Sequence, residues 1–183
     1  VAWCLSELGF TAAATPPSDD LLAALPLQFG IEENRLTIRC RGRLLEAELR
    51  QPHMAQWASR ISRFATVRQY LLQAQRQLAR TGNIVVEGRD TTTVVFPDSP
   101  CKVFLTADLA TRTRRRLIEH QEHQVRMDYA TLEAQIRARD QADAQRSLAP
   151  LKPAPDALLL DTSDLDIDEV VARLREFVAR AAS

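Results

Sequence analysis

An arginine and an aspartate stand together at a point in the sequence that suits phosphate binding. Arg89 and Asp90 closely follow the short run Asn83–Val86, which is apolar and β-branched after its first residue. In open α/β sheets, ligands bind beyond the carboxyl ends of the strands, and an arginine there can bind a phosphate through two N–H groups. The alternative interpretation is a loop that a salt bridge merely holds in place.

A second candidate lies in the segment 137–146. Arg139, Asp143 and Arg146 stand at positions i, i+4 and i+7, so a helix would place them on one face. Such a face could bind a polar ligand. The alternative is a solvated helix surface with an ordinary i,i+4 ion pair, which contributes little to stability.

Four arginines within five residues form a third candidate: Arg112, Arg114, Arg115 and Arg116. Their guanidinium groups repel one another unless an anion lies among them, and a polyphosphate is one such anion. A solvated helix end is the alternative. RNA binding is disfavoured because no aromatic residues alternate with the arginines and no basic tail extends the cluster.

Short apolar runs that alternate with helical patterns must position these residues. Three runs without polar alternation predict strands that are covered on both faces of a parallel sheet, at 83–86, 101–105 and 157–160. Helices are predicted at 109–123, 130–147 and 167–181. Asp164 or Asp166 is the expected N-cap of the last helix. This alternation predicts a three-layer α/β domain.

The N-terminal half carries a different pattern. A helix ending at Gly9 and a short helix at Leu21–Leu25 are expected first. Alternating residues between 27 and 40 predict two strands joined by a turn at Glu33-Asn34. Apolar residues at helical spacing then predict one long helix over Met54–Ala79, with a bend near Phe64.

Composition limits the class of protein. The 183 residues include 24 Lys+Arg and 24 Asp+Glu, a net charge of 24 − 24 = 0, and 45% are apolar. These values are typical of one soluble globular domain and exclude a disordered chain and a disulfide-stapled miniprotein. Without net positive charge, non-specific nucleic-acid binding is not expected. No apolar run reaches the roughly 18 residues of a membrane span.

Three cysteines, Cys4, Cys40 and Cys101, stand among apolar neighbours and match no zinc-binding spacing. Buried, reduced thiols are therefore expected. That expectation favours a reducing compartment such as the cytoplasm.

Taken in order, four segments resemble the bacterial cytidylate kinase family of P-loop nucleoside monophosphate kinases. They are GRDTTTVVFPDSPCKVFLTAD (88–108), RTRRRL (112–117), RARDQADAQRSLAPL (137–151) and DALLLDTSDLDIDEVV (156–171). The resemblance implies a single P-loop-kinase-like α/β domain over 1–183. Its parts would be a monophosphate-binding insert at 27–76, core strands with the Gly-Arg-Asp loop at 83–108, lid helices at 109–147, and a C-terminal strand and helix at 156–183.

The resemblance implies transfer of the γ-phosphoryl group of ATP to CMP or dCMP, with Mg²⁺, by a cytoplasmic monomer that binds neither nucleic acid nor membrane. Positioning and charge neutralisation dominate such transfers. It implies cytosine contacts by Ser59, Arg68 and Asp90, and sugar contacts by Arg139 and Asp143. It further implies acceptor-phosphate contacts by Arg89 and Arg146, and lid contacts to ATP by Arg115 with Arg116.

Several features depart from the family. Thr92 stands where the family usually has glycine, and Glu87 where Asp is common. No Gly-rich loop ending in Lys occurs in the 183 residues, which begin at Val1 rather than Met. We therefore expect an N-terminally truncated domain without its central strand, which leaves unpaired sheet edges. Such a chain should be unstable and unable to phosphorylate CMP.

Two alternatives remain open at this point. The chain could be a natural short form that binds CMP without catalysing transfer. It could also be a kinase of the same fold that acts on UMP, AMP or a non-nucleotide acceptor. Asp90 favours cytosine, because a carboxylate accepts hydrogen bonds from the exocyclic N4 amino group of that base.

Overall fold

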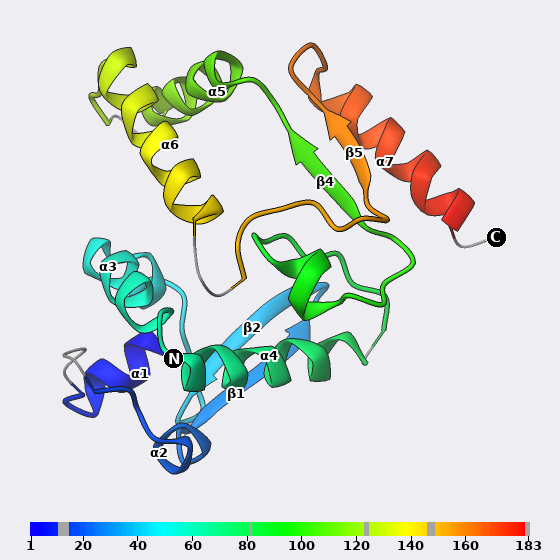
Figure 1. Cartoon of the computed structure of the whole chain (residues 1–183). Coiled ribbons are helices and arrows are strands. Elements are labelled where there is room, and N and C mark those ends of the chain that lie inside the picture. Colours follow the sequence, from blue (N-terminus) through cyan, green and yellow to red (C-terminus); the bar gives the residue numbers. More distant parts are fainter. Residues whose placement is uncertain (11–14, 81, 123–124, 146–148, 182–183) are drawn as a thin grey trace. The chain divides into compact units, whose positions relative to one another are not determined.

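The computed structural model describes residues 1–10, 15–80, 82–122, 125–145 and 149–181. The chain divides into two compact units, Val1–Val85 and Val86–Ser183. Both units combine helices with strands (Figure 1). The second unit contains a parallel strand pair. The predicted α/β class is therefore confirmed. Within the described residues, no helix is both long and apolar enough to cross a membrane.

In the described residues of the first unit, four α-helices accompany an antiparallel sheet whose strand order is β1-β2-β3. Its elements are α1 (Ala2–Glu7), α2 (Asp19–Ala23), β1 (Leu27–Glu32), β2 (Arg35–Cys40), β3 (Arg43–Leu44), the 3₁₀ turn η1 (Glu48–Arg50), α3 (Pro52–Ile61) and α4 (Ala65–Ala79). The predicted N-terminal helix is confirmed, and Gly9 follows its end with a positive φ of 71°.

The hairpin of β1 and β2 follows the predicted turn. Leu27 pairs with Cys40 and Glu32 with Arg35. Glu33 and Asn34 connect the strands with φ values of 50° and 60°. Two consecutive positive φ values are characteristic of a type I′ turn, whose twist matches that of the flanking strands. The turn at Glu33-Asn34 is therefore confirmed.

The long helix predicted over Met54–Ala79 is instead two helices, so that prediction is wrong in extent. α3 ends at Ile61 and α4 begins at Ala65, and Phe64 between them is extended, with φ −79° and ψ 126°. The interruption falls where the bend was expected. Ile61 and Phe64 are 3% and 9% exposed. With the break, both of these large side chains lie in the core. In one continuous helix, they would lie along a single helix face.

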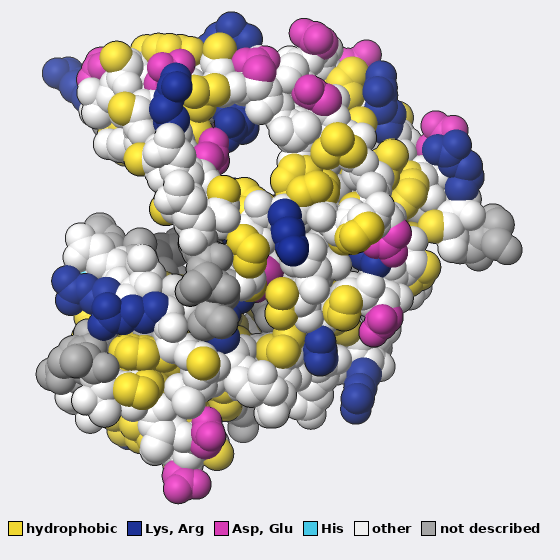
Figure 2. All heavy atoms as spheres, in the orientation of Figure 1, with side chains coloured by type: hydrophobic (Ala, Val, Ile, Leu, Met, Phe, Trp, Pro, Cys, Tyr) yellow, Lys and Arg dark blue, Asp and Glu magenta, His cyan; other side chains and the backbone are white. Residues whose placement is uncertain are grey.

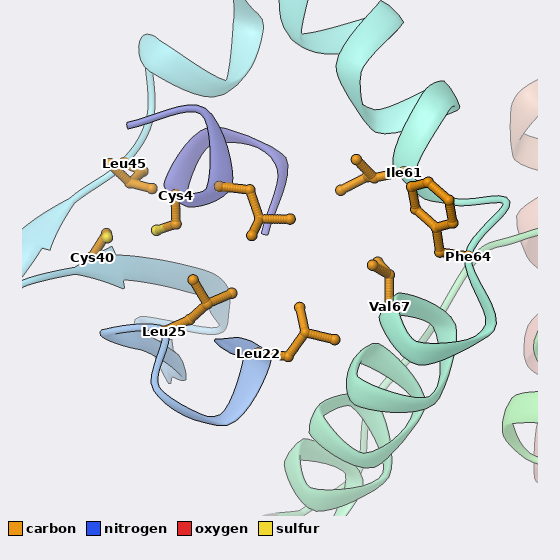
Figure 3. Close-up of a cluster of buried hydrophobic side chains, with 9 residues drawn as sticks. Cys4, Leu22, Leu25, Cys40, Leu45, Ile61, Phe64 and Val67 are labelled. Carbon is orange, nitrogen blue, oxygen red and sulfur yellow. The ribbon is translucent and has the colours of Figure 1, made fainter. Parts of the chain in front are cut away.

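A cluster of apolar side chains from five elements and from the segments between them forms the core of the first unit, and Figure 3 shows them pointing toward one another. It consists of Cys4, Leu5, Leu22, Leu25, Cys40, Leu45, Ile61, Phe64 and Val67. Burial raises the pKa of the Cys4 thiol to about 12. All three cysteines are free, Cys4 and Cys40 are buried, and Cys101 is partly buried. The expectation of buried, reduced thiols is confirmed for Cys4 and Cys40.

The second unit contains the parallel strands β4 (Val103–Thr106) and β5 (Leu158–Asp161), in register from Val103↔Leu158 to Thr106↔Asp161. The other elements are the π-helical turn η2 (Thr91–Val95) and the helices α5 (Leu109–Glu122), α6 (Tyr129–Ala144) and α7 (Ile167–Ala181). The predicted strands at 101–105 and 157–160 and the three predicted helices agree with these elements within a few residues, except that the predicted end of the second helix lies outside the described residues.

The predicted strand at 83–86 is wrong. In the described part of the chain, this segment belongs to neither sheet, and Val85 is fully exposed. A strand requires a neighbour that satisfies its backbone groups, and the segment has none there. The expected burial of both sheet faces is also not met, because Leu105 and Leu159 are 53% and 62% exposed.

Side-chain caps fix the starts of α6 and α7, as Asp108 does for α5. The Asp128 carboxylate accepts from Thr131 N at 2.9 Å and caps α6. Asp166 and Glu169 form a reciprocal capping box at α7, with N···O distances of 2.8 and 2.9 Å. Of the two candidates for the α7 N-cap, Asp166 is therefore the correct one.

Candidate functional site

The two Arg/Asp segments that the sequence singled out meet in the second unit at Asp143. The Asp143 side chain lies in the last turn of α6 and is 2% exposed. Arg89 Nε lies 3.2 Å from Asp143 Oδ2, and Arg139 Nε lies 4.0 Å from the same oxygen. Both guanidinium groups remain partly or largely exposed, at 39% and 69%. A buried carboxylate thus orients two accessible cations.

The backbone around Asp143 holds this carboxylate in place. The Asp143 carbonyl accepts a hydrogen bond from Leu151 N at 2.9 Å, across the end of α6. Leu132 of the same helix is buried. Arg139 and Asp143 share a helix face at i,i+4, as predicted. Arg89 is thus part of a salt-bridged loop and Arg139 part of a helical ion pair, as the two alternative interpretations expected. Neither contact prevents the exposed guanidinium groups from binding an anion.

The loop that carries Arg89 and Asp90 is tightly folded. A Cβ atom at Gly88 would lie 2.7 Å from Thr91 Cγ2, so a larger residue could not occupy that position without a shift. The Asp90 carbonyl accepts from Val94 N and Val95 N at 2.9 and 3.2 Å. This wide π-type turn is a feature that occurs frequently at functional sites.

The departure at Thr92 has a simple structural outcome. Thr92 belongs to η2 and is not among the described residues with positive φ. A β-branched residue therefore meets no left-handed backbone at this position.

Arginines on α5 contact protein groups near the carboxyl ends of the strands. Arg115 donates to Thr162 Oγ1 at 3.0 Å, to the Thr162 carbonyl at 2.6 Å and to the Leu165 carbonyl at 3.0 Å. Thr162 in turn donates through Oγ1 to the Thr106 carbonyl at 3.0 Å. Arg115 therefore fastens α5 to the segment that follows β5. Contact with ATP phosphates would require these bonds to break.

The other arginines of this cluster also have partners. Arg116 pairs with Glu119 at 2.6 Å, and Arg114 donates to Thr111 Oγ1 at 2.8 Å. The cluster is thus held by protein groups, and no anion is required to explain it.

Arg112 joins α5 to α6, a role that sequence reasoning missed. Its Nη1 lies 2.6 Å from Asp140 Oδ2, and its Nε donates to the Ala107 carbonyl at 2.9 Å. Spacing alone could not have separated Arg112 from the rest of the cluster, because Arg115 and Arg116 stand at i+3 and i+4 from it and both positions share its helix face.

Two carboxylates lie at the adjacent ends of β4 and β5. Asp108 accepts from the Thr111 backbone N–H and hydroxyl, both at 2.8 Å, and these bonds lower its pKa. Asp161 accepts from the Ser163 hydroxyl at 2.6 Å and from its N–H, which lower its pKa. No group of three or more metal-ligating side chains occurs among the described residues, so we assign no residue to Mg²⁺.

The candidates in the first unit lie on two different helices. Ser59 is exposed near the end of α3, and Arg68 is half-buried in the first turn of α4. The break at Phe64 separates them. Arg146 lies outside the described residues.

Charges of both signs occur on the face of the molecule that Figure 2 draws. On the face drawn in Figure 2, Lys and Arg side chains are interspersed with Asp and Glu. This face therefore offers no broad area of a single sign.

Comparison with known proteins connects these features with one family. A family model described as "Cytidylate kinase" matches residues 9–180. The chain is 42% identical to a Pseudomonas fluorescens protein named "Cytidylate kinase", over 98% of this chain and 85% of the relative. It is 39% identical to a protein of that name from Maridesulfovibrio salexigens, over 94% and 77%. A Lactobacillus gasseri protein of that name is 34% identical, over 88% and 70%.

Proposed function

Because the chain belongs to the cytidylate kinase family, we propose that the protein acts in the transfer of the γ-phosphoryl group of ATP to CMP or dCMP, which yields CDP or dCDP. The observation that carries the proposal is the buried Asp143 carboxylate with Arg89 and Arg139 beside it. Phosphoryl transfer depends on positioned cations more than on covalent chemistry, and this group positions two.

We assign the roles within this group by chemistry. Arg89 is the residue for the acceptor phosphate, because its guanidinium is partly exposed and lies beside the buried Asp143 carboxylate. Asp143 and Arg139 serve the sugar, as the family resemblance implies. Asp90 accepts from the cytosine N4 amino group. Arg146, Ser59 and Arg68 are further proposed substrate contacts, and Arg115 and Arg116 are proposed contacts of ATP.

The ATP side of the reaction needs phosphate-binding backbone and a lysine, which a Gly-rich loop supplies in P-loop enzymes. The 183 residues contain no such loop. The proposed transfer therefore requires such a loop in addition to these 183 residues, and we expect a polypeptide of the 183 residues alone to bind CMP without phosphorylating it. We further propose that the protein is a cytoplasmic monomer. When bound with ATP, Mg²⁺ would neutralise the charge of the phosphates.

Two measurements test the proposal. Isothermal titration of the 183-residue chain with CMP, dCMP, UMP and AMP should show preferential binding of the cytosine nucleotides. An assay for ADP release should show no CMP-dependent turnover. Equal affinity for all four nucleotides would refute the assignment to CMP, and robust turnover would refute the expected requirement for a Gly-rich loop.

The Asp90→Asn variant tests the assignment of the base contact. The Asp90 carboxylate can accept hydrogen bonds from the cytosine N4 amino group through two oxygens, whereas the amide of asparagine can accept through one oxygen only. The preference for CMP over UMP should therefore fall roughly tenfold. Asp98→Asn, in the same loop, is the matched control and should leave the preference unchanged. An unaltered ratio in Asp90→Asn would show that another residue reads the base.

A further inference from the structure

A buried lysine lies at the foot of the loop that carries Arg89 and Asp90. The chain uses lysine at two positions only, Lys102 and Lys152, and arginine at 24 − 2 = 22. Lys102 is 5% exposed. An ammonium group loses hydration when it is buried, so its partners must compensate. Although arginine is the common cation of this chain, one of its two lysines occupies this buried position. The geometry of the site must therefore suit an ammonium group.

Two partners surround the ammonium group. Lys102 Nζ donates to the Pro97 carbonyl at 2.6 Å and lies 2.5 Å from Asp156 Oδ2. The Asp156 side chain is 64% exposed, and its hydrogen bond with Lys102 lowers its pKa. A compact ammonium can make two contacts at different angles from one atom, whereas a planar guanidinium is larger and fixes its donors in a fork.

The Pro97 carbonyl is connected to Asp90 by a short series of hydrogen bonds. Phe96 N, one residue before Pro97, donates to the Thr91 carbonyl at 2.8 Å. Val94 N and Val95 N donate to the Asp90 carbonyl at 2.9 and 3.2 Å. The loop is thus closed on itself from Asp90 to Phe96, and Lys102 holds its far end.

Lys102 is itself fixed to the sheet. Its carbonyl accepts from Leu158 N at 2.9 Å, immediately before the paired residues Val103 and Leu158. The ammonium group therefore transmits the position of the β4–β5 pair to the loop. Asp156, two residues before Leu158, belongs to the same connection.

We propose that Lys102 is a positioning residue for nucleotide selection: by binding the Pro97 carbonyl and Asp156, it holds the π-type turn and so places Asp90 against the base. This inference rests on the proposed function in its use of CMP. Lys102 acts in this proposal through the Pro97 carbonyl and Asp156, so its role is positioning rather than catalysis.

The test compares Lys102→Met with Lys152→Met, an exposed lysine of the same unit. Affinities of the 183-residue chain for CMP and UMP are measured by titration calorimetry. Lys102→Met should lower the CMP/UMP affinity ratio roughly 2- to 30-fold, the range of couplings carried by positioning residues. Lys152→Met should leave it unchanged. An unchanged ratio in Lys102→Met, or equal weakening of both nucleotides, would overturn the proposal.

Hydrogen exchange keeps the inference separate from the proposed function. In Lys102→Met, the amides of Val94, Val95 and Phe96 should exchange faster than in the parent chain, whether or not CMP binds. If the parent chain shows no preference for CMP, the proposed function fails, and unchanged exchange would overturn the positioning role independently. Should Lys102→Met not fold, Asp156→Asn, with its exposed side chain, should show the same changes at smaller amplitude. Their absence there would also overturn the role.

Discussion

Two opposing contributions to stability act on the Asp143 carboxylate: the cost of its burial and its attraction to nearby arginines. Its carboxylate is 2% exposed, so it has lost most of its hydration, a loss that is costly without a partner of opposite charge. The Arg89 guanidinium at 3.2 Å compensates, and Arg139 at 4.0 Å adds a weaker attraction. The same carboxylate lies beside two guanidinium groups that remain partly or largely exposed. Stability and ligand positioning therefore depend on one side chain.

Replacement of Asp143 by asparagine should expose this dependence. Asp143→Asn keeps the size of the side chain but removes the charge that Arg89 and Arg139 face, so the free energy of unfolding should fall by roughly 1–3 kcal/mol. Urea unfolding followed by circular dichroism measures the change. Glu133→Gln on the same helix removes only a surface pair with Arg137 and should cost at most about 1 kcal/mol. Equal losses in both variants would contradict the special role of Asp143.

At the scale of elements, α5 is attached to the carboxyl ends of both parallel strands. Arg112 reaches the Ala107 carbonyl just after β4, and Arg115 reaches Thr162 just after β5. The Asp108 carboxylate caps the first turn of α5, and the Asp108 N–H donates to Ser163 Oγ at 2.8 Å. These contacts explain why the arginines in this cluster differ in role although they are adjacent in sequence.

The start of α7 offers an element-scale prediction with a matched control. Asp166→Ala removes the cap of the Glu169 N–H and half of the capping box, and should lower the free energy of unfolding by about 0.5–2 kcal/mol. Asp164→Ala, two residues earlier, removes an exposed carboxylate of the same charge. Thermal unfolding should separate the two variants. A larger loss in Asp164→Ala would refute the assignment of the cap.

At the scale of the whole molecule, the two units meet in sequence at Val85 and Val86. The segment around them has no ladder partner among the described residues, and Val85 is fully exposed. Backbone of this kind is the usual site of proteolytic cleavage, because a protease must bind its substrate in extended form.

Elastase, which cleaves after small apolar residues, should therefore cut after Val85 early in a limited digest. The Val94-Val95 pair in η2 is the internal control, since Val95 is buried and both residues donate to the Asp90 carbonyl. Cleavage after Val85 should be at least about tenfold faster than after Val94. Mass spectrometry of the fragments over time measures the two cleavage rates. Similar rates at both pairs would contradict the greater exposure of Val85.

Local features could be predicted because they depend on residues close in the chain. The turn at Glu33-Asn34, the parallel strands 103–106 and 158–161, and the helices around them follow from backbone preferences and the spacing of apolar residues. The i,i+4 relation of Arg139 and Asp143 follows from helix geometry alone. The four motif segments likewise indicate the family by their residues alone.

Only the tertiary structure decided which distant residues meet. It paired Arg89 with Asp143, interrupted the helix at Phe64, and set Lys102 between Pro97 and Asp156. It also left 83–86 outside both sheets. Such outcomes depend on the path of the chain and on which partners stabilise each buried group. The spacing of residues in the sequence does not encode either. The sequence by itself determined the local elements and the chemical groups on them. Packing decided which of those groups face one another, because a buried charge requires a partner wherever the fold can supply one.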